Sequence, residues 1–491
     1  MSFLHRTLFR LSWLAAGLFS LLAGAAQPGE VLLAGKGQST VLSVNGQSTI
    51  LSVNGQSTVL SVKEMLIRIE TGQPQLQAYR AESAAAGYTI GLAKNSLVPD
   101  LTLGYQAGYA TDNNITGMSY PGIVMPISGP VFNRESYDLV PGTALAAFLQ
   151  WTPLTFGQRA AAVEKASAVF KLAGSNYDNA LFQQRYAGIL IYLDLVYLQK
   201  LLASQQANIQ RVQTGLQQSL VLTKEGLRPG LDTVQFQSLL AQGIMEQLNT
   251  ERLYRAQQQE LSRLTGFTGN PQDLVISDTS LAMILPALPD TTGPYTQNPG
   301  YRYQQAQVAL STASLKQIER SWRPKLELWA NAYSRGSGIG ADGVLDKSAG
   351  WSLTRNNYGA GIQLSFPLLS FAKMNIQKKQ YRSLLQSDQA RLSQVSINLQ
   401  RQIGTAENNY TQNLRIAAQA PIQSRAARLS YEGLRLSYQS GLVDFTRLTQ
   451  GQYQLLNAEM MEAGAYLQVW RALLDIGVSK GNLNLFTDQL K

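Results

Sequence analysis

The chain has 491 residues, no cysteine and a formal net charge of +10 at pH 7. The absence of cysteine excludes disulfides and thiolate metal sites. The only histidine, His5, lies close to the N-terminus, so an enzyme built from the rest of the chain would lack the commonest general base and metal ligand. Lys and Arg residues form no dense cluster with interleaved aromatic residues, which argues against nucleic-acid binding. We therefore expect no catalytic site, no cofactor and no metal.

Residues 1–26 have the pattern of a secretory signal peptide. Arg6 and Arg10 accompany an apolar run that ends in small residues, and their removal would lower the net charge to +8. A membrane anchor is the alternative, but the apolar run is short for one. No other stretch approaches eighteen consecutive apolar residues, so we expect no transmembrane helix in the rest of the chain. Any insertion into a membrane would then have to use strands.

A tandem nonapeptide follows the signal peptide. The units GQSTVLSVN, GQSTILSVN and GQSTVLSVK occupy residues 37–63. Three units of nine residues are too few to bury a core of their own. We interpret residues 27–63 as a weakly ordered N-terminal arm. The alternative is a small stacked β element or a surface tether.

Beyond residue 63 the sequence divides into two related halves. Pro74 and Pro299 lie 225 residues apart in similar segments, and Pro99 and Pro324 repeat that offset. The first half carries about eleven extra residues in a loop at 110–142 that is rich in Gly, Pro and Asn. The predicted organisation is a first repeat at 64–266, a crossover segment at 267–296, a second repeat at 297–478 and an irregular C-terminal tail at 479–491.

Each half is expected to contain two amphipathic strands. In the last of the four, Tyr358, Ile362 and Leu364 fall on one face, whereas Gly361 and Gln363 fall on the other. The wall of a membrane β-barrel requires such alternation, although a strand in a sandwich shows it too. If the strands form a barrel, an aspartate at Ile362 should harm assembly more than one at Gly361. The four strands are predicted at about 99–109, 143–152, 325–334 and 357–367.

A very long helix follows the second strand of each half. The first is predicted at Gly157–Leu227, and the second, from Phe371 to about Tyr438, would be about 100 Å long at 1.5 Å per residue. Such helices must pack side by side as coiled coils, and they are too long to cover a sandwich, which favours the barrel interpretation of the strands. Pro421 should kink the second helix because it removes one backbone donor. Shorter return helices are predicted at Leu231–Thr265 and Leu442–Ile476.

Three residues of the second half stand out against this helical pattern. Asp388 is the one departure from apolar three-or-four spacing along the second long helix. Gly441 can adopt the left-handed conformation that ends a helix. Asp444 is placed to cap the next helix.

The paired motifs resemble the outer-membrane efflux protein family, typified by TolC, over roughly residues 59–490. The resemblance rests on the helix–strand junctions QPQLQAYR, NSLVPDLTL and RSWRPKLEL, on the turns GLRPGLDTVQFQSLLAQ and GLVDFTRLTQGQYQLLNAE, and on LSRLTGF at the close of the first half. It implies a mixed α and β fold with two structural repeats per chain. In this fold a long antiparallel α-helical coiled-coil barrel adjoins a trimeric 12-stranded transmembrane β-barrel with four strands per chain. On physical grounds four strands cannot close a barrel, so a chain of this kind must oligomerise to insert.

The resemblance also implies a gate at the periplasmic end. In the family, an aspartate at the turn between the two helices of the first repeat bonds a tyrosine at the corresponding turn of the second repeat. Asp232 and Tyr438 match these two positions. The arginine that usually joins this pair is replaced here by Val443. If the pair is not a latch, Asp232 is a helix N-cap and Tyr438 an interface packing residue.

The family's narrowest ring is formed by aspartates just beyond the second turn. This sequence has Arg447 and Gln450 there, with Asp444 one turn earlier. We expect Asp444 to pair with Arg447 and neutralise it in part, because residues three apart share a helical face. The pore tip should then be less cation-selective than that of relatives with aspartate rings.

The sequence therefore predicts a passive exit duct of a tripartite efflux or secretion system in the outer membrane of a Gram-negative bacterium. The implied partners are two further copies of the chain, a periplasmic adaptor protein, an inner-membrane pump and outer-membrane lipid. The alternative is a periplasmic coiled-coil adaptor or scaffold, which would explain the long helices but not the amphipathic strands. A glycosidase-like carboxylate enzyme is disfavoured because no α/β or sandwich pattern is present.

Overall fold

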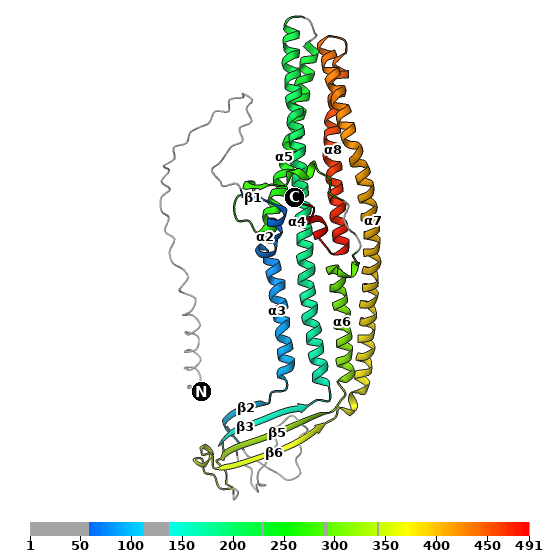
Figure 1. Ribbon diagram of the computed structural model, residues 1–491. Helices are drawn as coiled ribbons and strands as arrows, with labels where there is room; N and C mark the ends of the chain where they lie inside the picture. The colour runs from blue at the N-terminus through cyan, green and yellow to red at the C-terminus, as the bar shows by residue number, and fades with distance from the viewer. Residues whose placement is uncertain (1–57, 112–136, 227–229, 288–292, 341–342, 491) are drawn as a thin grey trace, which may run out of the picture. The chain divides into compact units, whose positions relative to one another are not determined.

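The computed structural model describes residues 58–111, 137–226, 230–287, 293–340 and 343–490, which belong to one compact unit (Figure 1). The predicted signal peptide, the first two nonapeptide units and most of the loop at 110–142 lie outside the described residues.

Four antiparallel strands form one sheet in the order β2-β3-β5-β6 (Figure 1). Each predicted strand is present, with ends that differ from the prediction by a few residues. The strands are β2 at Asp100–Ala110, β3 at Val140–Leu154, β5 at Lys325–Ser337 and β6 at Arg355–Ser365. A register shift in β3 near Trp151 and Leu154 marks the end that faces the helices.

The register places the apolar residues of all four strands on the same face of the sheet. One row across the sheet joins Leu103 to Ala147, Ala147 to Ala332, and Ala332 to Tyr358. The alternate row joins Gly104 to Ala146, Tyr333 and Asn357. Most large apolar residues of the first face are exposed in this chain, including Leu101, Leu103, Tyr105, Leu145, Tyr358, Ile362 and Leu364. We refer to this face as the apolar face and to the other as the polar face.

Each strand adjoins a helix at the same end of the sheet (Figure 1). A helix precedes β2 and β5, and a helix follows β3 and β6. The helices keep the order of the strands, because α3 packs on α4, α4 on α6, and α6 on α7. Farther from the sheet, α5 packs along α4, α8 packs along α7, and α4 contacts α8. The bounds are α3 Pro74–Asn95, α4 Gln158–Lys224, α5 Gly230–Thr265, α6 Pro299–Arg320, α7 Phe371–Gln439 and α8 Phe445–Lys480. The two long helices are therefore confirmed, and α7 runs as one helix through Pro421.

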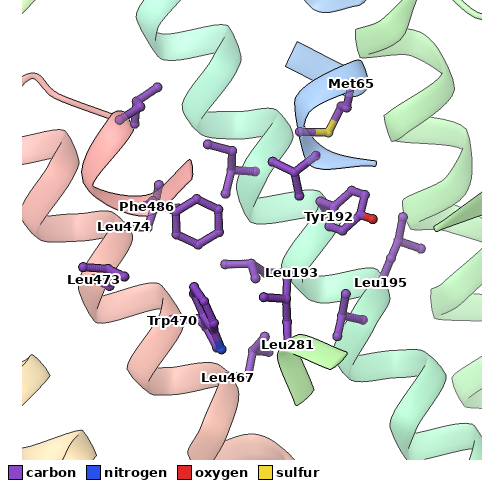
Figure 2. Close-up of a cluster of buried hydrophobic side chains, with 14 of the residues drawn as sticks. Met65, Tyr192, Leu193, Leu195, Leu281, Leu467, Trp470, Leu473, Leu474 and Phe486 are labelled. Carbon is purple, nitrogen blue, oxygen red and sulfur yellow. The ribbon is translucent and has the colours of Figure 1, made fainter. Parts of the chain in front are cut away.

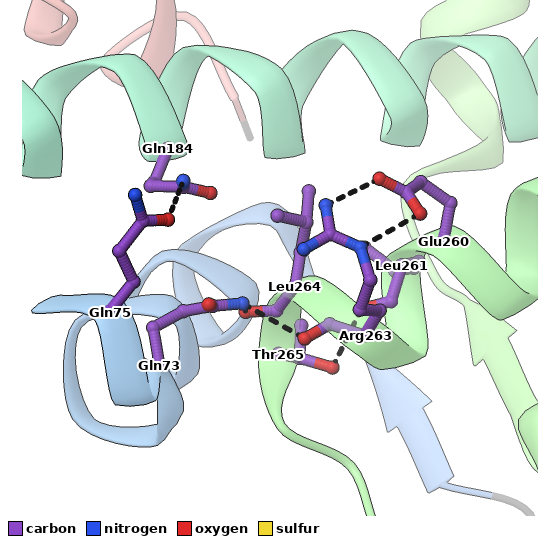
Figure 3. Close-up of polar contacts among 8 residues, drawn as sticks. All are labelled: Gln73, Gln75, Gln184, Glu260, Leu261, Arg263, Leu264 and Thr265. Carbon is purple, nitrogen blue, oxygen red and sulfur yellow. Dashed lines mark hydrogen bonds and ion pairs between the residues drawn. The ribbon is translucent and has the colours of Figure 1, made fainter.

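The paired proline motifs have matching roles in the two halves. Gln73, which precedes α3, donates its side-chain amide to the carbonyls of Arg263 and Leu264 in the last turn of α5 (Figure 3). Asn298, which precedes α6, donates its amide to the carbonyls of Val478 and Ser479 in the last turns of α8. Helix-terminal carbonyls lack partners within their own helix, so each amide satisfies groups that would otherwise be buried unpaired.

Short elements between the helices enclose the main hydrophobic core (Figure 2). Its fully buried residues include Tyr192 and Leu193 of α4, Trp470 of α8 and Phe486 of α9. The elements are α2 Val62–Gly72, α9 Asn484–Thr487, the strands β1 Thr58–Leu60 and β4 Leu274–Ile276, and the 3-10 helices η1 Pro271–Asp273, η2 Thr279–Ala282 and η3 Tyr295–Gln297. Two further 3-10 helices, η4 Ala349–Trp351 and η5 Leu368–Ser370, flank β6.

The core corrects two predictions. The last nonapeptide unit is not a weakly ordered arm in its described part, because β1 pairs in parallel with β4 and the Leu60 side chain is fully buried. The Ser61 hydroxyl then caps α2 by accepting a hydrogen bond from the Glu64 N–H. The C-terminal tail is not irregular either, because the Phe486 ring packs edge-on against Trp470 with centroids 5.6 Å apart. In both cases buried apolar side chains hold a short segment in the core.

By length and composition alone, one of the described helices, α4, could cross a membrane. No unbroken run of eighteen apolar residues lies in α4; only the mean hydropathy of an 18-residue window within it reaches the level of a membrane span. Its most apolar side chains, among them Ile189 and Leu193, are buried by α2, α8 and the crossover elements. Packing within the chain buries 39% of this window.

Candidate functional site

The two helical hairpins end in turns that the sequence specifies locally. Gly226, after α4, and Gly441, after α7, have φ angles of 70° and 75°, which a residue with a side chain adopts only with strain. Asp444 caps α8 as predicted, since its carboxylate accepts the Arg447 backbone N–H at 2.9 Å. These features stop the long helices at matched positions and start the return helices.

The structure brings Asp232 and Tyr438 together at these turns. The Tyr438 hydroxyl donates a hydrogen bond of 2.8 Å to the Asp232 carboxylate. Tyr438 is only 2% exposed, and its ring lies edge-on to Phe236 and Phe445. The bond therefore links the α4–α5 hairpin to the α7–α8 hairpin within one chain, over a small aromatic cluster. We name Phe236, Tyr438 and Phe445 the tip cluster.

Sequence reasoning missed the two phenylalanines of the tip cluster. Phe236 is almost fully buried and fills the space beside Gly215 on α4, where a Cβ would lie 2.4 Å from its ring. The signal was available in the sequence, because Phe236 follows Asp232 by four residues and so faces the same way.

The expected ion pair between Asp444 and the Arg447 side chain is not present. Asp444 has extended backbone angles (φ −83°, ψ 169°) because it precedes the first turn of α8. Its carboxylate therefore points at the backbone N–H of Arg447 and not at the guanidinium, as is usual for an N-cap. Arg447 and Gln450 are both exposed in this chain.

A second polar contact between the hairpins lies farther from the turns. The Glu459 carboxylate on α8 accepts hydrogen bonds of 3.1 Å from Arg211 on α4 and from Arg428 on α7. The Glu459 side chain is only 12% exposed, so this pairing is screened less than a surface ion pair. We name these three residues the Glu459 clasp. Nothing in the sequence pattern singled them out, because each carries one charge among many along its helix.

A cavity of about 550 Å³ lies between the tip cluster and the Glu459 clasp. Its walls include Tyr431, whose pKa is raised because burial disfavours the phenolate, against the opposing effect of Arg211. Arg211 also lies over the Tyr431 ring, 6.0 Å from its centroid. Among the described residues, no group of three or more Cys, His, Asp or Glu side chains could hold a metal ion. The hydrogen bonds at the tip therefore join the α4–α5 hairpin to the α7–α8 hairpin.

Comparison with known proteins identifies the fold. No protein-family model and no curated sequence matches the chain. The chain is similar to the solved structure of the outer-membrane channel OprN (16% identity, TM-score 0.69, covering 86% of this chain and 90% of that one). It is similar to the outer membrane protein VceC of Vibrio cholerae (14% identity, TM-score 0.68, 86% and 96%). It is also similar to the open state of the MtrE outer membrane channel of Neisseria gonorrhoeae (12% identity, TM-score 0.67, 86% and 89%). The chain thus has the fold of TolC-like outer-membrane channels.

Proposed function

We propose that this chain forms an exit duct in the outer membrane, which carries its cargo passively across the periplasm and the outer membrane. The observation that carries the proposal is the four-stranded sheet, whose apolar face is exposed and whose strands continue directly into helices of 67 and 69 residues. A sheet of this kind suits lipid on one face and water on the other. Helices of about 100 Å provide a conduit on the aqueous side.

The sheet argues for an oligomer. Strands β2 and β6 each have one neighbour, so both edges of the sheet are open. Open edges are not tolerated in the hydrocarbon layer, and about eight strands are needed to close a barrel. We propose a homotrimer in which β6 of one protomer pairs with β2 of the next, giving twelve strands.

The helices support the same arrangement. On α7 the apolar side chains of Ile422, Leu429 and Leu436 are exposed at intervals of seven residues. On α5 the exposed pair Leu231 and Val234 recurs two heptads later as Met245 and Leu248. Both are coiled-coil seams without a partner in the chain, and α5 and α7 lie at opposite ends of the order α5, α4, α8, α7. A head-to-tail contact between α5 and the neighbouring α7 would cover both and close a ring.

We propose that Asp232 and Tyr438 form part of a periplasmic gate. Their hydrogen bond ties together two hairpins that would have to separate for the tip to open. The exposed residues Asp444, Arg447 and Gln450 would lie near the constriction. The outermost turns would meet a periplasmic adaptor protein, which in turn would connect the duct to an inner-membrane pump.

The second candidate, a periplasmic scaffold that never enters a membrane, is separated from the duct by cell fractionation and conductance. For the duct we expect the chain in the outer-membrane fraction as a heat-modifiable, SDS-resistant oligomer that conducts ions in planar bilayers. A soluble periplasmic pool without conductance would establish the scaffold instead.

A matched pair of substitutions tests which face meets lipid. Leu103→Lys places a charge on the exposed apolar face, which costs about 2–4 kcal/mol near the bilayer midplane. Gly104→Lys places the same charge on the polar face, where a Cβ would meet no atom within 4 Å. We expect the first variant to lose the SDS-resistant oligomer and the second to retain it. Equal loss in both variants would contradict the assignment of faces.

A further inference from the structure

Two arginines stand side by side at the end of the sheet that points away from the helices. Arg335 of β5 and Arg355 of β6 are direct partners in the antiparallel register. Residues opposite each other in such a pair have Cα atoms about 4.5–5.5 Å apart and side chains on the same face. The row continues through Ala144 to Gln106, so both arginines lie on the polar face, in line with Tyr333 and Asn357.

Within the described part of the chain, the two guanidinium groups have no carboxylate partner. Among the residues that the structure describes, neither arginine lies within ion-pairing distance of an acidic side chain. Asp346, in the adjoining loop, already accepts hydrogen bonds from Ser348 and Ala349. The nearest acidic side chain on the same face of β5 is Glu327, eight residues away or about 27 Å along the strand. That separation is several Debye lengths at physiological salt.

At this end of the sheet, the described part of the β5–β6 loop does not lie over the polar face. The loop between β5 and β6 folds over the opposite face, where the Thr143 hydroxyl donates to the Gly350 carbonyl at 2.9 Å. On that face the Trp351 ring also packs edge-on to Tyr109, with centroids 5.5 Å apart. Arg335 and Arg355 are both exposed. Their exposed side chains can reach a ligand on the polar side.

We propose that Arg335 and Arg355 form an anion-binding site for a phosphate- or carboxylate-bearing ligand at the outer mouth of the pore. Like charges placed directly opposite each other destabilise a strand pair, and a bound anion removes that repulsion. Each guanidinium offers a planar fork of N–H donors that matches two oxygens of a phosphate or carboxylate. The inference rests on the proposed function, in which the polar face lines the pore and three copies place three arginine pairs around one mouth.

The anion bound by the two arginines could be one of two kinds, an anion in the pore or the phosphate of a lipid headgroup. The register favours the pore, because lipid would meet the apolar face and the arginines lie on the other one. Two measurements separate the sources. The first needs no channel and uses the detergent-solubilised full chain, and the second places the site in the conduction path.

For the first measurement, tripolyphosphate is titrated calorimetrically into the full chain in a non-ionic detergent. The double variant Arg335→Gln with Arg355→Gln should bind at least about tenfold more weakly than wild type, since hydrogen bonds between charged groups are lost. The single variant Arg335→Gln should also weaken binding. Its matched control is Lys347→Gln, which removes one charge from the adjoining loop and should change the affinity little. Equal affinity of the double variant and wild type would overturn the proposal. A loss of affinity in Lys347→Gln as large as that in Arg335→Gln would also overturn it.

For the second measurement, tripolyphosphate is added to the mouth side of channels in a neutral phosphatidylcholine bilayer. We expect block in wild type and its loss in the double variant. Block or binding that occurs only when anionic lipid is present would assign the pair to headgroups and overturn the site in the pore. The absence of any wild-type channel would instead contradict the proposed duct, and the calorimetric result would still decide the anion site.

Discussion

At the scale of single residues, the Tyr438 hydroxyl joins the two hairpins next to their turns. Tyr438→Phe removes its bond to the Asp232 carboxylate, worth about 1.5–3 kcal/mol, but keeps the ring against Phe236 and Phe445. We expect a higher single-channel conductance because the tip opens more often. Tyr431→Phe is the matched control, since Tyr431 is buried two turns earlier on α7 and its hydroxyl makes no hydrogen bond in the described structure. Unchanged conductance in Tyr438→Phe would leave Tyr438 as a packing residue only.

The Asp475 carboxylate predicts a dependence of stability on pH. Its pKa is raised from the ordinary value of 3.8, mainly because burial disfavours the charged form, although the Tyr186 hydroxyl and Arg471 oppose the shift. The folded protein therefore binds this proton more tightly than the unfolded chain. The resulting stabilisation is fully present below pH 3.8 and is lost as the pH rises through the raised pKa.

Asp475→Asn should abolish this dependence, because an amide can still accept the Tyr186 hydrogen bond but does not titrate. Thermal unfolding midpoints measured from about pH 4 to pH 7 should fall less with rising pH in the variant than in wild type. Glu82→Gln, which removes an exposed carboxylate from α3, controls for the loss of one charge. Parallel pH profiles for wild type and Asp475→Asn would contradict the argument.

Single residues were predicted well only where their partner is close in sequence or fixed by the resemblance. The Asp444 cap depends on the next three residues, and the Asp232–Tyr438 bond came from the match to the family. The sequence could not show that Asp388 is buried and accepts a hydrogen bond from Ser311, because that partner lies on α6. Nor could it show that Gly361 faces the Trp329 ring, where a Cβ would lie 2.7 Å from ring atoms. An aspartate at Gly361 would therefore clash and is no longer a useful control.

At the scale of elements, β1 lies in the segment that the sequence predicted to be a weakly ordered arm. Leu60 is fully buried beside β4, whereas its neighbour Val59 is 56% exposed. Leu60→Ala should lower the free energy of unfolding by about 2–5 kcal/mol through lost contacts and the cavity left behind. Val59→Ala, one residue away on the other side of the strand, should change it far less. Denaturant unfolding of both variants checks this, and similar small losses would mean that β1 is not held in the core.

Elements were predictable where one period continued for many residues. Alternation over about ten residues identified the strands, and apolar three-or-four spacing identified α7. Short elements such as β1, β4 and α9 carry no such signal, since three or four residues cannot establish a period. They are held by side chains that enter a core built from distant helices, as Phe486 does beside Trp470.

At the scale of the whole molecule, the proposed association of copies accounts for several exposed surfaces at once. The apolar face, the two open edges of the sheet and the seams on α5 and α7 are all unfavourable in an isolated chain in water. The proposed ring of protomers in a membrane would cover the edges and seams with protein and the apolar face with lipid. The sequence predicts the chemistry of these surfaces, but the register that aligns them across four strands had to come from the structure.

The seam on α7 gives the last prediction. Leu429 is 64% exposed in the chain and lies seven residues from both Ile422 and Leu436. In the proposed ring it packs against α5 of the neighbouring protomer, so Leu429→Glu would bury a charge in a coiled-coil seam and break the contact. Ser430→Glu puts the same charge on the adjacent exposed position, outside the seam. We expect the SDS-resistant oligomer to be lost in Leu429→Glu and kept in Ser430→Glu, with both protomers equally helical by circular dichroism. If Leu429→Glu assembles as well as Ser430→Glu, α7 meets water or another partner, and the ring must close through the strands alone.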